Sequence, residues 1–576
     1  MDILNKPWTS KTFTWPTAFT VLIVSLIFSR FCVLNIPCSV GEDLALQMLS
    51  TRQWVNGNSR LPNLVAMPQL SDLSTNTFAW ILRPPGSSFI PIPGLLLGLP
   101  FGYSVSVMLF LLGVFSAVGW LKLAKSFSIC KSALYLLAII LSLNVAVDSL
   151  KLSTASVVSA ATFPWLLMWS IYIGEQWEEN KRIFKSNHLL FFAIIGAHAF
   201  FKLSSLITLS GVAFLPFMLS LPQSMRTRWT LWLRVCAAIL VFLTPFFIAS
   251  SLNERMTGLS SNELYSRQDY NAQHELWGKH FSESTKGAML ATSWIASLGY
   301  ASPIQPITHR FRDFLLQFTT FSDFLNKREI NSRILGCCLM SIPFSIFIFV
   351  CLMRLKSIIS RKTFATYFSL FFIPYIGFTL ISFYHGFNYL IYPSYTKEFS
   401  VVFILFGLSF LTQSNKETIN KSSSKIITAF LVVLPLLTAI KSFYSMTARS
   451  NQYAMTSSYE KSEALGPSKF SKSMELISED SNSTLDVCIF LCAGDAADHC
   501  LRIPMRSLSL HFSKGNIQSL PLISSSQPLN LYCLIDPKLS EDRSFINDVL
   551  SKIPKSALLT RLDPLTWRFE IRKVNS

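Results

Sequence analysis

The sequence predicts an α-helical polytopic membrane protein with about eleven transmembrane helices and a small C-terminal α+β domain outside the membrane. Three observations lead to this fold class. Only 14% of the 576 residues are charged, whereas about 25% is usual for a soluble protein. Many apolar stretches approach or reach the roughly 18 residues that cross about 30 Å of hydrocarbon. Short loops rich in Lys and Arg alternate with less basic loops along the chain.

The apolar stretches give the topology. The first stretch follows Lys6 and Lys11, is long and has no small-residue cleavage site after it, so we expect a retained anchor rather than a signal peptide. Basic loops belong on the cytoplasmic side. This places the N-terminus inside the cell, the C-terminus outside and the protein in the plasma membrane. The predicted spans are 17–36, 103–121, 132–148, 154–174, 188–202, 204–221, 229–250, 334–353, 364–383, 398–413 and 426–444.

This topology predicts a membrane domain of residues 1–444, with outer loops at 37–102 and 251–333, and an extracytoplasmic tail. The tail is predicted to contain a linker at 445–480 and an α+β domain at 481–576. Within that domain, the apolar patterns predict four strands and one helix. The strands are LDVCIFLC, LNLYCLID, SALLTRLD and WRFEIRK, and the helix is EDRSFINDVLSKI.

The net charge of +18 does not indicate a nucleic-acid partner. From Met446 to the end the chain has 15 basic and 14 acidic residues, so the excess lies in the membrane part. Basic cytoplasmic loops account for such an excess. We therefore expect membrane lipids as partners and no nucleic acid.

Four of the eleven cysteines lie in the predicted outer domain: Cys488, Cys492, Cys500 and Cys533. An even set in an oxidising compartment favours one or two disulfides, with three ways of pairing. A zinc site is the weaker alternative, because CIFLC lacks the C-x2-C knuckle spacing. Free thiols are a further alternative.

Two adjacent carboxylates, Glu42 and Asp43, follow the first span in GEDLALQMLSTRQWVNG. The apolar residues after them predict a helix that lies along the membrane interface. A carboxylate held there can act as a general base on an acceptor that attacks a lipid-linked donor. The alternative is an ordinary solvated pair.

An arginine, Arg83, occurs in WILRPPG, before an apolar stretch rich in Gly and Pro. Pro84 and Pro85 prevent a helix from continuing through this segment, so we expect Arg83 in a turn at the interface. A guanidinium there can bind phosphate oxygens in a bidentate manner. Binding of ordinary lipid head groups is the alternative.

An acid after the first span, a loop helix that ends in W-V-x-G, and then R-P-P-G resemble the GT-C class of membrane glycosyltransferases. The chain is most similar to the protein O-mannosyltransferase and lipid A aminoarabinose transferase superfamily, in pattern over about residues 15–225. This resemblance implies transfer of a sugar from a polyprenyl-phosphate carrier to an acceptor on the outer face of the membrane. No cofactor is required, and a divalent cation is compatible with the reaction.

The resemblance also assigns residues. Asp43 best fits the acid of the first loop, with Glu42 as the alternative. Asp148, in NVAVDSLKLSTAS, is the candidate second acid, and a turn residue is its alternative role. Lys202, in AHAFFKLSS, is a candidate for binding the carrier phosphate, and snorkelling to the membrane surface is the alternative.

A later outer segment, FYHGFNYLIYPSYTKEFSVV, resembles the RY-x-P element of the superfamily, but the Arg is absent. His385 and Lys397 are the candidate phosphate ligands in this segment. The missing Arg leaves the ligand on this side undetermined.

Nucleotide-binding and hydrolase motifs are absent from the sequence: it contains no P-loop, H-E-x-x-H or G-x-S-x-G. This absence fits a lipid-linked donor. Two alternatives belong to other functional classes. One is a transporter or flippase of lipid-linked sugars, for which the expected repeats are not visible, and the other is a non-catalytic envelope assembly protein.

Overall fold

The computed structural model describes most of the first 257 residues, one later helix and most of the C-terminal sheet. The described residues are 14–32, 38–40, 42–57, 64–69, 72–80, 85–126, 131–152, 156–179, 186–202, 204–220, 228–257, 361–385, 440, 460–461, 465, 470–481, 486–492, 510–513, 522–537, 539 and 541–572.

Contacts divide the chain into two compact units. The helical unit consists of Met1–Arg30, Leu112–Val145 and Ser156–Tyr444. The sheet unit consists of Phe31–Leu111, Ala146–Ala155 and Ser445–Ser576. The first outer loop thus belongs to the same unit as the C-terminal tail. The predicted domain boundaries at 444 and 480 stay predictions.

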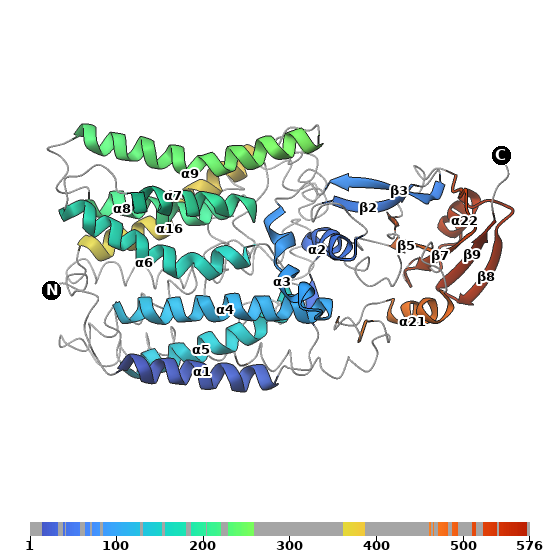
Figure 1. Ribbon diagram of the computed structural model, residues 1–576, viewed down its shortest axis with the longest axis horizontal. Helices are drawn as coiled ribbons and strands as arrows, with labels where there is room; N and C mark the ends of the chain where they lie inside the picture. The colour runs from blue at the N-terminus through green and yellow to red at the C-terminus, as the bar shows by residue number, and fades with distance from the viewer. Residues whose placement is uncertain are drawn as a thin grey trace, which may run out of the picture. The chain divides into compact units, whose positions relative to one another are not determined.

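Long apolar helices dominate the N-terminal half, and α6, α7, α8 and α9 run alongside one another (Figure 1). Phe101–Ala124, Val157–Trp177 and Leu233–Leu252 are each long and apolar enough to cross a membrane. The helices are α1 (Thr14–Cys32), α4 (Phe101–Ser126), α5 (Lys131–Asp148), α6 (Val157–Glu179), α7 (Ser186–Ala197), α8 (Ser205–Ser220), α9 (Arg228–Thr257) and α16 (Arg361–His385).

The described part of the chain is mostly helical, as a polytopic membrane protein requires. The predicted spans from 17–36 to 229–250, and also 364–383, fall on these helices. Spans 334–353 and 398–413, and all of 426–444 except Ile440, lie outside the described residues. The count of eleven spans stays a prediction.

Glycines allow the helices of the helical unit to pack closely. A Cβ atom at Gly211 in α8 would lie 2.5 Å from the backbone oxygen of Ser369 in α16. The Ser369 hydroxyl donates to the Gly211 oxygen at 2.6 Å. A Cβ atom at Gly196 in α7 would overlap the Phe242 oxygen of α9. Small residues at such contacts are the usual means of helix association in membranes.

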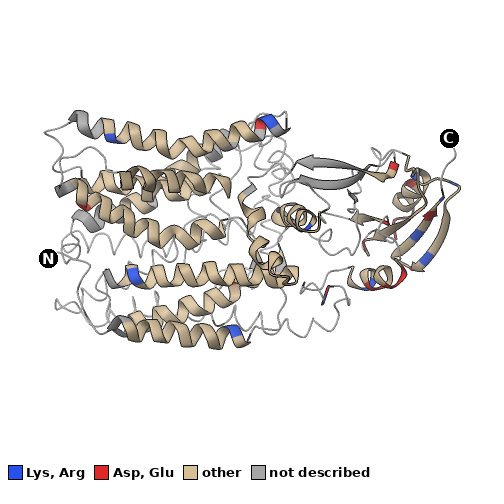
Figure 2. Cartoon of the chain, viewed as in Figure 1, with Lys and Arg blue, Asp and Glu red and all other residues tan. Residues whose placement is uncertain are grey.

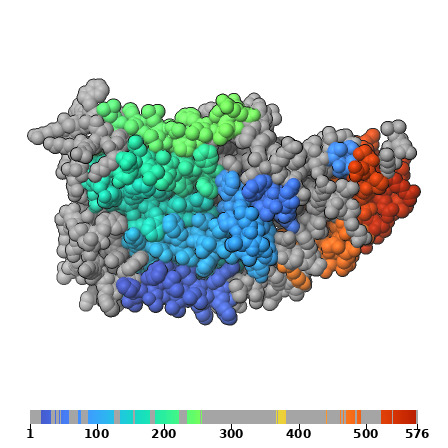
Figure 3. Space-filling view, viewed as in Figure 1, coloured from blue at the N-terminus to red at the C-terminus, as the bar shows by residue number. Residues whose placement is uncertain are grey.

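The outward faces of the membrane-type helices are apolar. In α9, Leu233, Leu240 and Phe247 are more than half exposed, and Figure 3 shows this helix along the edge of the helical unit. In the described helices of this unit, charged residues lie mainly near the helix ends (Figure 2). Contiguous exposed apolar surface of this kind is suited to lipid.

The C-terminal part of the sheet unit is a five-stranded sheet in the order β6-β5-β7-β9-β8. β5 is parallel to β6 and β7, whereas β9 is antiparallel to β7 and β8. The strands are β5 (Val487–Cys492), β6 (Leu510–Ser513), β7 (Leu529–Ile535), β8 (Leu558–Asp563) and β9 (Thr566–Ile571). Four of them fall on the strands that the sequence predicts, while β6 was not predicted.

Two helices cover opposite faces of this sheet. α22 (Arg543–Lys552), which the sequence predicts, buries Phe545 and Val549 in an apolar cluster with β5, β7 and β9. α21 (Ser471–Asp480) lies on the other face, where Phe470 packs against Phe490 at 5.1 Å between ring centroids. Met474 and Ile477 of α21 are buried, so the last part of the predicted linker, residues 445–480, contains a helix that packs on the sheet.

The disulfide prediction is wrong for two of the four cysteines. Cys488 and Cys533 are buried and form no disulfide. In the β5–β7 register, Cys488 is opposite Tyr532 and Cys533 is opposite Ile489. The two cysteines therefore point to opposite faces of the sheet, and Cys533 lies in the apolar cluster. The side chain of Cys492 and all of Cys500 lie outside the described residues.

Candidate functional site

The two acidic candidates begin a helix, as the sequence predicts. Helix α2 spans Glu42–Val55, so Glu42 and Asp43 are its first two residues. It ends at the W-V-N-G motif, where Gly57 has a φ of +76° and donates its N–H to the Trp54 oxygen at 3.0 Å. Glycine supplies this left-handed conformation without steric cost. The side chains of Glu42 and Asp43 lie outside the described part of the structure.

Both apolar and polar side chains of α2 are buried. We expected a helix that lies along the membrane interface, and that location stays a prediction. Leu44 and Met48 are buried, but so are the polar residues Gln47, Ser50 and Thr51. Protein therefore covers both the apolar and the polar sides of α2. The hydroxyls of Ser50 and Thr51 donate to backbone oxygens inside the protein, as buried polar groups usually do.

A buried hydrogen bond joins α2 to the segment that follows Arg83. The 3-10 helix η1 spans Pro85–Phe89 and is followed by α3 (Ile92–Leu96). The Thr51 hydroxyl donates to the Ser88 oxygen at 2.6 Å, and α2 packs against both η1 and α3. Arg83 itself lies outside the described residues, but it stands only two positions before η1. An early and a late part of the first outer loop are thus held together.

A short parallel pairing joins α2 to the second acidic candidate. β1 (Ser39–Val40) pairs with β4 (Lys151–Leu152) in the register Ser39 to Lys151 and Val40 to Leu152. Asp43 stands three residues after β1, and Asp148 stands three residues before β4. Three residues span at most about 10 Å and paired strands are about 4.8 Å apart. The two acidic positions are therefore within roughly 25 Å of each other in backbone distance.

Asp148 is the last residue of α5, and its side chain is exposed. The chain turns directly after it, with Leu150 donating its N–H to the Val147 oxygen at 3.1 Å. An exposed carboxylate at the end of a helix is accessible to a substrate. The predicted alternative, a residue at a turn, describes its place in the chain and is compatible with a role in chemistry.

Two serines that the sequence analysis did not select lie beside this arrangement. The hydroxyls of Ser87 and Ser88, in η1, are fully buried and find no hydrogen-bond partner among the described residues. Leaving a buried hydroxyl without a partner costs about 1–3 kcal/mol. The signal in the sequence was a pair of adjacent serines in an otherwise apolar stretch, GSSFIPIPG.

The remaining phosphate candidates belong to the helical unit or lie outside the described residues. Lys202 follows the 3-10 helix η2 (His198–Phe200) and is partly exposed, in the turn between α7 and α8. Its N–H donates to the His198 oxygen, and its own oxygen accepts from Ser205, both at 3.0 Å. His385 is the last residue of α16, but its side chain is not described. Lys397 lies outside the described residues.

Comparison with known proteins finds one match. Neither protein-family models nor curated proteins give any. The chain is similar in structure to ArnT. The match is the crystal structure of ArnT from Cupriavidus metallidurans bound to undecaprenyl phosphate. The two chains are 12% identical, with a TM-score of 0.44 over 97% of this chain and 98% of that one.

A metal site is not apparent in the described part of the chain. There, no three His, Cys, Asp or Glu side chains gather in a group that could hold a metal ion. The side chains of Glu42 and Asp43 are not among those searched. The expectation about a divalent cation therefore stays a prediction.

Proposed function

We propose that this chain is a GT-C-type glycosyltransferase that moves a pentose or hexose from a polyprenyl-phosphate carrier to an acceptor on the outer face of the plasma membrane. The observation that carries the proposal is the double attachment of α2. The β1–β4 pairing holds its acidic end to the segment after Asp148, and the Thr51–Ser88 hydrogen bond holds it to the segment after Arg83. The helix that begins with the candidate base and the segment that follows the candidate phosphate ligand thus belong to one packed assembly.

The reaction needs a base at the acceptor. In this proposal Asp43 accepts the proton of the acceptor hydroxyl or amine as that atom attacks the anomeric carbon of the donor. Glu42 is the alternative base, and Asp148 orients the acceptor from the end of α5. A single displacement inverts the anomeric centre. General-base catalysis of this kind contributes about 10²- to 10⁴-fold to the rate.

The leaving group needs positive charge and hydrogen-bond donors. The bond between the anomeric carbon and the phosphate oxygen breaks, and negative charge develops on the polyprenyl phosphate. Arg83 binds two of its oxygens, and fixed donors aimed at a developing charge lower the barrier. The buried hydroxyls of Ser87 and Ser88 are suitable further donors, because a phosphate oxygen would supply the partner that they need.

Other parts of the chain supply further candidates. Lys202, His385 and Lys397 are proposed as additional phosphate ligands. The donor and the membrane lipids are the proposed partners, and the acceptor belongs to the cell envelope as a lipid, glycan or protein.

The test is transfer in membranes that contain the wild-type chain or Asp43→Asn. A radiolabelled polyprenyl-phosphate pentose or hexose serves as the donor, and label is followed into lipid, glycan and protein fractions. Asp43→Asn should lower transfer by about 100-fold or more at equal protein abundance. Glu42→Gln is the matched control one position away, and it should retain most of the activity.

A second measurement separates binding from chemistry. A photoactivatable polyprenyl phosphate should label the wild type and Asp43→Asn equally, and it should label Arg83→Ala weakly with partial recovery in Arg83→Lys. Equal transfer by wild type and Asp43→Asn would remove the assigned base. Binding of the carrier without any transfer, together with carrier movement across vesicles, would favour the flippase alternative instead.

A further inference from the structure

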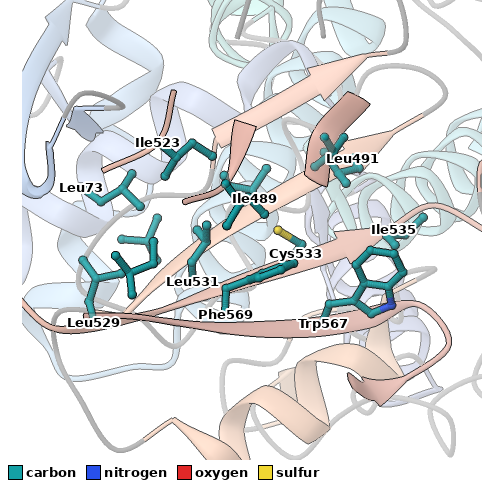
Figure 4. Packing of buried hydrophobic residues seen from close by; sticks show 14 of the residues in the cluster. Leu73, Ile489, Leu491, Ile523, Leu529, Leu531, Cys533, Ile535, Trp567 and Phe569 are labelled. Carbon is teal, nitrogen blue, oxygen red and sulfur yellow. The ribbon is translucent and has the colours of Figure 1, made fainter. Parts of the chain in front are cut away.

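A β-hairpin of the first outer loop enters the core of the C-terminal sheet. The hairpin consists of β2 (Leu64–Gln69) and β3 (Asp72–Trp80), which pair antiparallel. Leu73, near its tip, is 1% exposed and belongs to the apolar cluster of the sheet. Figure 4 shows it beside Ile523 and Leu529. Among the described residues of this cluster, Leu73 alone comes from outside the last 90 or so residues of the chain.

Hydrogen bonds fix the same tip. The Leu73 N–H donates to the Ser524 oxygen at 2.9 Å. The Asp72 carboxylate accepts from the Ser526 N–H at 2.9 Å, and the hydroxyls of Ser74 and Ser526 lie 2.7 Å apart. Three bonds between segments about 450 residues apart in sequence, together with one buried leucine, form a specific contact.

The other end of the hairpin meets the candidate site. β2 packs against α2, and β3 ends at Trp80, three residues before Arg83. At about 3.3 Å per residue, the eight steps from Asp72 to Trp80 extend roughly 26 Å. The hairpin therefore connects the C-terminal sheet with α2, the helix that begins with Glu42 and Asp43.

An isolated two-stranded hairpin is only marginally stable in water. The stability of the β2–β3 hairpin therefore depends on its contacts with other segments, and its tip contacts the C-terminal sheet. Loosening the tip should therefore loosen the stem, and with it the packing of α2. Displacement of a catalytic group by about 1 Å can lower a rate by about 100-fold.

We propose that Leu73 is a positioning residue, through which the C-terminal sheet holds α2 in the geometry required for transfer. Asp72 and Ser74 assist it by fixing the hairpin tip to Ser526. This inference rests on the proposed function, and it gives the C-terminal domain a role in setting the rate of transfer.

The test begins with Leu73→Ala in the full-length protein in membranes. We expect kcat for transfer to fall by about 10- to 100-fold with little change in KM for the donor. Leu73→Met, which keeps the volume, should restore most of the rate. Leu531→Ala is the control, since it empties space in the same cluster from β7. It should destabilise the sheet without lowering kcat per folded molecule.

A reversible cross-link provides the rescue. Ser74→Cys with Ser526→Cys should form a disulfide, because the hydroxyls that they replace already touch. In the Leu73→Ala background, oxidation should raise kcat and reduction should lower it again. No redox effect, or no disulfide by mass spectrometry, would contradict the proposal, and so would equal loss in Leu73→Ala and Leu531→Ala.

Hydrogen exchange separates this proposal from the proposed function. Leu73→Ala should accelerate exchange in peptides of α2 and the hairpin, but not in β5 and β7. If the wild type transfers no sugar while this exchange pattern appears, the anchor holds and the proposed function fails. If the wild type transfers sugar and Leu73→Ala changes neither kcat nor exchange in α2, the positioning role is refuted.

Discussion

The hydrogen bond between Thr51 and Ser88 allows a sharp test of the candidate site. Its donor and acceptor atoms are 2.6 Å apart and the Thr51 side chain is fully buried. Thr51→Val keeps the shape of the side chain but removes the donor, so the Ser88 oxygen loses this partner. Loss of a buried bond of this kind costs about 1–3 kcal/mol. Because the bond holds α2 against η1, most of that cost should appear at the site.

The expected result follows from this free energy. If about 1–2 kcal/mol is lost from the geometry needed in the transition state, transfer slows by about 5- to 30-fold. The assay is transfer from a radiolabelled polyprenyl-phosphate sugar at equal protein abundance. Thr51→Ser retains the hydroxyl and should keep most of the rate. Ser50→Ala removes a neighbouring buried hydroxyl that donates within α2, to the Gln47 oxygen at 2.8 Å, and should have a smaller effect.

Either of two results would refute this reasoning. The first is a wild-type rate and wild-type hydrogen exchange in η1 for Thr51→Val, which would show that the bond does not hold the segment. The second is an equal loss of activity in Ser50→Ala and Thr51→Val, which would show a general effect on α2 rather than a link to η1.

Three further predictions concern other parts of the chain. Burial raises the pKa of the Cys533 thiol to about 12, so maleimide at pH 8 should label this thiol only after denaturation. Because Cys533 forms no disulfide, the labelling should need no added reductant. Gly211→Ala places a methyl group against a backbone oxygen of α16 and should cost about 1–3 kcal/mol, measured as a lower Tm in detergent. Gly174→Ala meets side-chain atoms of Leu219 and no backbone atom among its nearest neighbours, and it should cost less. Desolvation alone would raise the pKa of Asp72, but hydrogen bonds from serines lower it from 3.8 to about 2. The stabilising contribution of Asp72 to the hairpin tip is therefore present above about pH 4 and is lost as the pH falls toward 2. Faster pepsin cleavage within the hairpin at the lower pH would detect this loss.

Elements with a strong local pattern could be predicted from the sequence. The apolar stretch 103–121 became α4, and the strands around Ile489 and Leu531 became β5 and β7, because their residues are buried on both sides. The W-V-N-G motif correctly marked the end of α2, since glycine has the conformation that ends a helix. In each case the pattern that predicts the element lies in the residues that form it.

Contacts between distant segments could not be predicted in this way. β1 and β4 have two residues each, too few for an alternation of apolar and polar residues to be visible. Leu73 is one leucine in a polar turn, and nothing local shows that it enters a core formed by residues 487–571. The disulfide prediction failed for a related reason. Whether two cysteines can meet depends on the register of their strands, and the register places Cys488 and Cys533 on opposite faces.

The same contacts explain why the acidic end of α2 is the strongest part of the site. Three independent connections converge on the chain around this helix: the β1–β4 pairing, the Thr51–Ser88 hydrogen bond and the packing against β2. A helix that only had to cover apolar surface would not need Gln47 and Thr51 buried as well. Burial of polar groups lowers stability unless each group is paired. We therefore interpret the buried polar residues of α2 as groups that fix the position of this helix. Glu42 and Asp43 are the first residues of α2, and η1 begins two positions after Arg83. The contacts therefore hold together the two segments next to which we propose a base and a phosphate ligand.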